Sequence, residues 1–240
     1  MELFNTFFIS QLIAHFLSDF IFQTNAIALH KNEKGVKTKY LYYHILITFL
    51  FSYIFSFQWN FIIGALAISL AHFIIDATKA YMMKKGYLKK YLFYIDQFLH
   101  LSVIAIVVYL FQQHYQINDV FSIDKKYLLM ILGFVITAKP ANIFIKEIFK
   151  SFDITVGKGG DLPNAGKLIG IIERWLILIF VIIGQFEAVG FLLASKSILR
   201  YGDKDNDDPK KTEYVLIGTL LSFAIAVVAG ILIIKLNQIK

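Results

Sequence analysis

The stretch His15-Phe16-Leu17-Ser18-Asp19-Phe20-Ile21-Phe22-Gln23 sets two ionisable side chains four residues apart within apolar sequence. The same spacing recurs in His72–Asp76 and, in reverse order, in Asp96–His100. Residues at positions i and i+4 share one face of an α-helix. Because ionisable side chains are costly inside a bilayer, three such pairs within apolar helices indicate a functional site.

The composition is that of an integral membrane protein. Hydrophobic residues make up 58% of the chain and charged residues only 17%, and the mean hydropathy is +0.63. A soluble domain of this length would carry more charge and shorter apolar runs. The chain contains no cysteine, which excludes disulfides and thiolate chemistry. The net charge of +7 lies mostly in short loops between apolar runs, which favours lipid headgroups over nucleic acid as a partner.

The apolar runs predict an all-α fold, a polytopic transmembrane helix bundle with about seven spans. Each run approaches the roughly 20 residues that a bilayer requires. We expect one integral membrane domain over residues 1–240, with a four-helix part at 1–112 and a three-helix part at 127–240. The predicted spans cover residues 3–28, 40–58, 60–83, 90–112, 127–150, 169–199 and 213–236.

Loop charges predict the orientation of these spans. Lysines crowd the first and third loops, whereas the second turn, around Trp59, carries no charge. Since positively charged loops stay in the cytoplasm, we expect a multi-pass protein of the bacterial inner membrane with its N-terminus outside and its C-terminus inside. The sixth run is ambiguous. One span over 169–199 is our interpretation, although a break at Gly184-Gln185 would give two half-helices and return the next loop to the cytoplasm.

Seven residues of the first four spans form the candidate site. The first and third spans run inward and read His then Asp, whereas the fourth runs outward and reads Asp then His. At 1.5 Å per residue, the three carboxylates and His44 should lie roughly 7–14 Å from the cytoplasmic helix ends. The other three imidazoles should lie roughly 15–20 Å from those ends. The seven residues are His15, Asp19, His44, His72, Asp76, Asp96 and His100.

Histidine and aspartate together form the ligand set of zinc, manganese or iron, whereas magnesium and calcium prefer oxygen alone. We therefore expect a divalent metal, zinc first, with manganese or iron as alternatives, and seven candidate ligands leave room for a dinuclear centre. Asp19, Asp76 and Asp96 are the candidate catalytic carboxylates, one of which would be the base that activates water. Gln23 and Lys79 are candidates for substrate binding.

The second half of the chain carries weaker signals. Lys139-Pro140 lies mid-span, where the proline should kink the helix and free backbone carbonyls. Lys139 is a candidate for substrate binding, although structural pairing with Glu187 is the simpler interpretation. Glu173-Arg174 is interpreted as an interface anchor. The remaining intramembrane polar residues are Gln185, Glu187, Lys196, Arg200 and Glu213. We expect Lys196 and Arg200 to pair with Glu213 rather than to bind a lipid phosphate.

The motifs around the three His/Asp pairs, with His44 and Lys79, resemble the bacterial domain-of-unknown-function family 3307. Later motifs at 164–174, 190–200 and 213–222 are similar to longer members of that family, so the resemblance covers nearly the whole chain. The resemblance implies a polytopic membrane protein and no assigned activity. The first half is more distantly similar to the YdjM-type membrane-bound metal-dependent hydrolases, which place His and Asp in transmembrane helices.

These features predict a membrane-embedded metal-dependent hydrolase. Its substrate would be a lipid-like ester, amide or phosphoester that reaches the site laterally from the membrane lipid. A proton- or ion-coupled small transporter could use the same Asp/His chain as a relay. A third class is a non-catalytic membrane scaffold, for which a homodimer is the candidate assembly and in which the polar cluster only fixes helix register.

Overall fold

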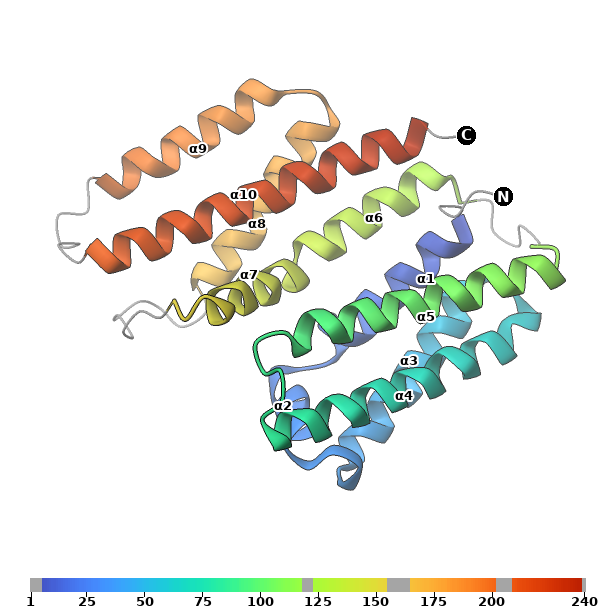
Figure 1. Ribbon diagram of the computed structural model, residues 1–240. Coiled ribbons are helices and arrows are strands. Elements are labelled where there is room, and N and C mark those ends of the chain that lie inside the picture. Colours follow the sequence, from blue (N-terminus) through green and yellow to red (C-terminus); the bar gives the residue numbers. More distant parts are fainter. Residues whose placement is uncertain (1–5, 118–122, 155–164, 202–208, 239–240) are drawn as a thin grey trace. The chain divides into compact units, whose positions relative to one another are not determined.

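The computed structural model describes residues 6–117, 123–154, 165–201 and 209–238 (Figure 1). Every element within these ranges is a helix, which confirms the all-α prediction. The chain divides into two compact units, Met1–Leu132 and Gly133–Lys240, which we call unit 1 and unit 2.

Unit 1 is built from four long helical segments and one short helix. Its elements, in chain order, are α1 (Thr6–Phe16), the π-helix η1 (Leu17–Phe22), α2 (Asn25–Lys34), the 3₁₀ turn η2 (Gly35–Lys37), α3 (Lys39–Ser56), the 3₁₀ turn η3 (Trp59–Phe61), α4 (Ile62–Lys85) and α5 (Leu92–His114). The first predicted span, 3–28, is wrong at its end: the helix stops at Phe22, and the chain bends by 91° into α2. The Thr24 side chain caps α2 by accepting a hydrogen bond from the Ile27 amide.

The helices of unit 1 turn their polar faces inward. On α3 the buried residues recur every four positions, at His44, Thr48 and Ser52, whereas Leu46 and Leu50 are exposed. A four-residue repeat places one stripe of side chains along a helix. A polar stripe inside and an apolar surface outside is the arrangement expected of helices surrounded by lipid.

One end of the unit 1 bundle is closed by aromatic rings. Phe61 is fully buried, and its ring contacts Phe7 and Phe111 edge-on, with both centroid distances at 4.9 Å. Ile68 of α4 and Val108 of α5 belong to the same apolar cluster. The polar stripe is therefore sealed from that end of the bundle.

Unit 2 begins within α6 (Lys125–Thr137) and continues through α7 (Lys139–Ser151), α8 (Ala165–Ile182), α9 (Phe186–Tyr201) and α10 (Pro209–Gln238). The axes of α6 and α7 are bent by 42° at Ala138, immediately before Lys139-Pro140. This confirms the predicted proline kink.

The prediction of one span over 169–199 is wrong. Gly184 adopts φ = +78°, a left-handed conformation that ends α8, and the chain reverses into α9 (Figure 1). The hairpin is closed by an ion pair of 2.5 Å between Glu173 of α8 and Lys196 of α9. The expected partner for Lys196, Glu213, is instead an exposed residue of α10.

Because α9 reverses the chain, α10 runs parallel to α8. Arg174 and Ser222 are hydrogen-bonded, and about two helical turns further along both helices, Val181 lies against Gly230. A Cβ atom at Gly230 would come within 2.6 Å of the Val181 side chain, so glycine permits this close approach.

Three described helices are long and apolar enough to cross a membrane: Trp59–Lys85, Leu92–His114 and Thr212–Gln238. The number rises to five if each of the two bent pairs, Thr6–Lys37 and Lys125–Ser151, is one span. These helices, with the inward polar stripe, are what is expected of a membrane protein with three to five spans.

Candidate metal centre

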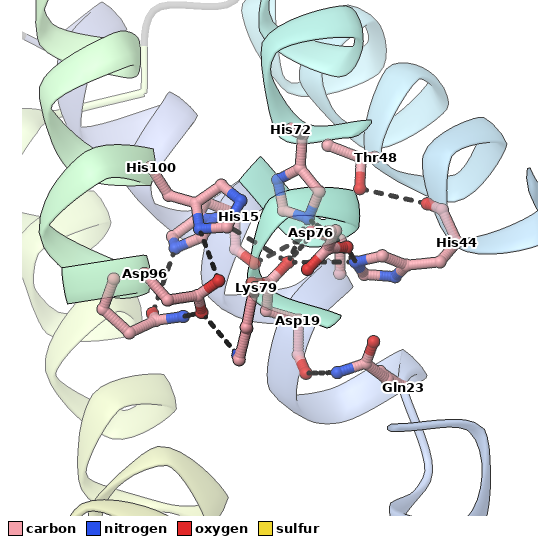
Figure 2. Close-up of polar contacts among 12 residues, drawn as sticks. His15, Asp19, Gln23, His44, Thr48, His72, Asp76, Lys79, Asp96 and His100 are labelled. Carbon is pink, nitrogen blue, oxygen red and sulfur yellow. Dashed lines mark hydrogen bonds and ion pairs between the residues drawn. The ribbon is translucent and has the colours of Figure 1, made fainter. Parts of the chain in front are cut away.

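The seven residues of the candidate site meet inside unit 1. All of them are buried, and none is more than 8% exposed. They come from η1, α1, α3, α4 and α5, and in Figure 2 their side chains point toward one another between these helices. Residues 85 positions apart in the sequence, His15 and His100, have rings in contact with centroids 5.5 Å apart.

The centre of the cluster is a group of four ligand-type atoms, which we call the core. His44 Nε2 and His72 Nε2 are 2.9 Å apart. Asp19 Oδ1 lies 3.4 Å from each of these nitrogens, and Asp76 Oδ2 lies 3.7 Å from His44 and 3.5 Å from His72. Around a tetrahedral zinc with bonds of 2.0–2.1 Å, ligand atoms are about 3.3 Å apart. The five separations that involve a histidine nitrogen therefore bracket the spacing of a zinc site.

Asp19 reaches the core from a π-helix. The segment Leu17–Phe22 has the wider π turn, and it follows α1 without a break. Asp19 also accepts a hydrogen bond from Ser18, 3.2 Å away, and lies 3.8 Å from His15. Single π turns inside helices are frequent at functional sites. The sequence spacing predicted that His15 and Asp19 share a face, but it gave no sign of the π turn.

A second tier of side chains lies against the core. The His100 ring contacts the His72 ring, with centroids 3.9 Å apart, and His100 Nδ1 lies 3.9 Å from Asp96 Oδ1. His15 Nε2 is 3.4 Å from Gln97 Oε1, and Gln97 in turn donates to Asp96. Within the described part of the chain, both ring nitrogens of His100 and Asp96 Oδ1 make no hydrogen bond. These buried polar atoms are the ones free to bind an ion or a water molecule.

Two ammonium groups border the cluster. Lys31 of α2, which is 5% exposed, lies 2.5 Å from Asp76 Oδ2, and Lys79 lies 2.8 Å from Asp96 Oδ2 (Figure 2 shows Lys79). The position of Lys79 was anticipated near this site, but Lys31 was interpreted as a loop charge. Thr24, a residue type that favours helix N-caps, was a signal in the sequence that a new helix starts before Lys31. Nothing in the sequence showed that this helix, α2, packs against α4 and places Lys31 beside Asp76.

The remaining predicted site residues lie elsewhere. Gln23 ends η1 and donates to the backbone oxygen of Asp19, 3.1 Å away, so it contacts the edge of the site. Lys139 is the first residue of α7 in unit 2. Gln185 and Glu187 are exposed at the α8–α9 turn, not in the middle of a span. The side chain of Arg200 is outside the described residues.

Unit 2 has a polar centre of its own at Arg174, which the sequence interpretation placed at a membrane interface. This residue is 1% exposed. It donates to the carbonyls of Thr137 and Ala138, which the kink frees, and to Asn142 Oδ1 and Ser222 Oγ. The sequence predicted that the proline would free backbone carbonyls, but it did not identify their donor. Arg174, an ionisable residue within an apolar run, was the signal that could have identified it.

Comparison with known proteins gives one result. The family described as "Protein of unknown function (DUF3307)" matches residues 7–130, which begin at α1 and end two residues before the boundary of unit 1. No curated protein matches the chain. No solved structure matches it either. The later motifs of the second half lie beyond the matched range. The chain belongs to the DUF3307 family through the half that carries the His/Asp cluster.

Proposed function

We propose that the protein is a membrane-embedded metal-dependent hydrolase of lipid-like substrates. The observation that carries this proposal is the core: two buried imidazole nitrogens lie 2.9 Å apart, and two buried carboxylate oxygens each lie 3.4–3.7 Å from both nitrogens. Nitrogen and oxygen ligands in this arrangement suit zinc, with manganese or iron as alternatives.

The charges of the cluster also favour a bound cation. Asp19, Asp76 and Asp96 contribute three negative charges, and Lys31 and Lys79 contribute two positive ones. With neutral imidazoles the cluster is left with one net negative charge, inside a bundle whose surface is apolar. A divalent cation with a hydroxide would make the site neutral. A buried charge is costly unless it is compensated in this way.

We assign His44, His72, Asp19 and Asp76 as the metal ligands. The metal would supply Lewis acidity toward water and toward an ester or phosphoryl oxygen. Asp96 and His100 lie beside the core with unoccupied polar atoms, so they are placed to take a proton from water. If a second ion binds, the same pair with Asp76 provides its ligands, because their ligand atoms lie within 4.8 Å of one another.

The substrate class follows from the surroundings. The outward faces of α3 and α4 are apolar, with Leu46, Ile54, Leu70 and Ile74 all exposed. A substrate that reaches a site between such helices must itself be lipid-soluble over part of its length. We therefore propose an ester, amide or phosphoester of a lipid, with Lys79 and Gln23 at the edge of the site for its polar end.

Metal content of the detergent-purified protein tests this proposal. We expect about one or two equivalents of zinc, manganese or iron in the wild type and in His114→Ala, and loss of the core metal in His44→Ala and His72→Ala. His114 is the matched control, because it is an exposed histidine on α5 outside the cluster. Equal metal in all four proteins, or no metal in the wild type even after reloading, would contradict the proposal.

A proton or ion relay is the second candidate, favoured by the ammonium groups. Lys31 and Lys79 already neutralise Asp76 and Asp96, and contacts run without a gap from Lys31 through the core to His15, Gln97 and Lys79. This candidate predicts a flux in proteoliposomes that depends on a pH gradient and continues without metal. Hydrolysis of lipid substrates by the metal-loaded protein would exclude it as the main function.

We also propose a revised topology for the inner membrane. If the N-terminus is outside, the loop charges place the start of α8 in the cytoplasm. The hairpin of α8 and α9 returns the chain to the cytoplasm, so α10 starts there and the C-terminus lies outside rather than inside.

Since the chain has no cysteine, single introduced cysteines can be labelled without background. We expect an impermeant maleimide to label Glu187→Cys and Gln238→Cys in intact cells, and Lys150→Cys only after permeabilisation. Labelling of Lys150→Cys in intact cells would overturn this topology.

A further inference from the structure

Unit 2 contains a pocket of about 520 Å³ that no part of the proposed hydrolase uses. It opens between α7, α8 and α10, with one wall from α9. All of its lining residues belong to unit 2, and so the inference below does not depend on the metal centre.

The lining of the pocket is strongly basic. Lys146, Lys167, Arg174 and Lys196 line it, and Glu173 is the single acidic residue among the lining residues that the structure describes. Glu173 is engaged by Lys196 at 2.5 Å. Even without Lys167, which has an interaction of its own, the described lining cations outnumber the carboxylate by two. A concave site with such an excess attracts anions.

Arg174 forms the floor of the pocket and is the strongest argument for an anion. Its side chain is 1% exposed, and its four described partners are two backbone carbonyls, an amide oxygen and a hydroxyl, all of them neutral. These groups satisfy its hydrogen bonds without compensating its charge. The Glu173 carboxylate acts on Arg174 electrostatically but is itself paired with Lys196, so an anion in the pocket would lower the cost of burying the guanidinium.

The N-terminal end of α8 lies at the pocket and adds to the positive potential there. Gly166 and Gly170 line the pocket in the first two turns of α8, and the N-terminal end of a helix carries a partial positive charge. A Cβ atom at Gly170 would come within 3.2 Å of Arg174 Nη1, so glycine keeps the space beside the guanidinium open.

The other walls of the pocket are apolar. Ile145 and Phe149 of α7 and Val215 of α10 face it, so a ligand must combine an anionic group with an apolar part. Basic pockets between transmembrane helices are sites for anionic lipid headgroups. We propose that the unit 2 pocket binds the phosphate of an anionic phospholipid, with Arg174 at its floor and the lysines at its rim.

The test measures binding of phosphatidylglycerol to the purified full-length chain in nanodiscs and by native mass spectrometry, with phosphatidylcholine as the zwitterionic comparison. We expect Lys146→Gln and Lys196→Gln each to weaken phosphatidylglycerol binding about fivefold, the effect of one basic residue near a lipid surface. Lys150→Gln is the matched control, because this exposed lysine of α7 lies outside the pocket and pairs with Glu147.

Glu173→Gln gives the opposite prediction. It removes the one negative charge of the lining and releases Lys196, so phosphatidylglycerol should bind more tightly than to the wild type. A structural role for the Glu173–Lys196 pair would instead leave affinity unchanged or lower it. The proposal is overturned if Lys146→Gln, Lys196→Gln and Glu173→Gln all bind phosphatidylglycerol as the wild type does, or if phosphatidylcholine binds equally well. Inorganic phosphate is the last probe: binding as tight as that of the lipid would assign the pocket to a soluble anion.

Discussion

The two units each bury a polar centre, but they satisfy it in opposite ways. In unit 1 every carboxylate of the cluster has an ionisable neighbour, and the group as a whole has more negative charge than positive. In unit 2 a single guanidinium is surrounded by neutral oxygens. Buried charge of either sign is tolerated only with compensation. The comparison supports the two proposals made above, a bound cation in unit 1 and a bound anion in unit 2.

The largest effect is expected when the arginine is removed. Arg174→Met leaves the Thr137 and Ala138 carbonyls and the Asn142 side chain without their donor. We expect a loss of about 3–5 kcal/mol in the free energy of unfolding, the usual cost of breaking a buried charged network. Thermal unfolding in detergent measures this loss, with Lys150→Met as the exposed control. A loss no larger than that of the control would contradict this prediction.

The next effect is on unit 1 and distinguishes a metal site from an ion-pair network. Lys31→Met removes the ammonium group that lies against Asp76. Without metal we expect the variant to be about 3 kcal/mol less stable, because Asp76 is left uncompensated. Added zinc should restore most of that stability, since the freed oxygen is a ligand. If zinc stabilises the variant no more than it does the wild type, the core does not bind metal through Asp76.

A smaller effect is expected from a single contact of the unit 2 centre. Ser222→Ala removes one neutral acceptor from Arg174, and Arg174 keeps its three other partners. One hydrogen bond to a charged group contributes about 1.5–3 kcal/mol. We expect a loss at the low end of this range by thermal unfolding, together with unchanged metal content. A change in metal content would show that the two centres are coupled.

The smallest effect concerns the hairpin that brings Lys196 to the unit 2 pocket. Gly184→Ala places a side chain at φ = +78°, where no atom lies within 4 Å of its Cβ, so only backbone strain is added. We expect a loss of about 1 kcal/mol by thermal unfolding and a weaker preference for phosphatidylglycerol. Gly190→Ala, also with open space around its Cβ but without positive φ, should lose nothing.

The sequence was informative where the chemistry follows helix periodicity. Four-residue His/Asp spacings predicted that each pair shares a helix face and that the pairs lie at matching depths, because a helix preserves a face over several turns. They did not show that the pairs meet, because the order of the helices around the bundle is not written in the spacing. The proline predicted the kink before Lys139 for an equally local reason.

The sequence was uninformative where the chain changes direction. The 91° bend after Phe22 brings Lys31 to Asp76, and the reversal at Gly184 brings Lys196 to Glu173. Apolar runs on either side of a break look the same whether the chain continues or turns back. Hydropathy therefore joined α8 and α9 into one span and missed the partners that only the turns create.

The π-helix that carries Asp19 makes the centre more sensitive to changes in length than to changes in identity. A π turn holds one residue more than an α turn, so deleting a single residue within 17–22 would return the segment to α geometry. The turn that carries Asp19 would narrow, and the Asp19 carboxylate would shift away from its positions beside His44 and His72. Substitutions of the apolar residues at 20–22 leave the register intact, so natural variants of this segment should differ by substitution and keep its length.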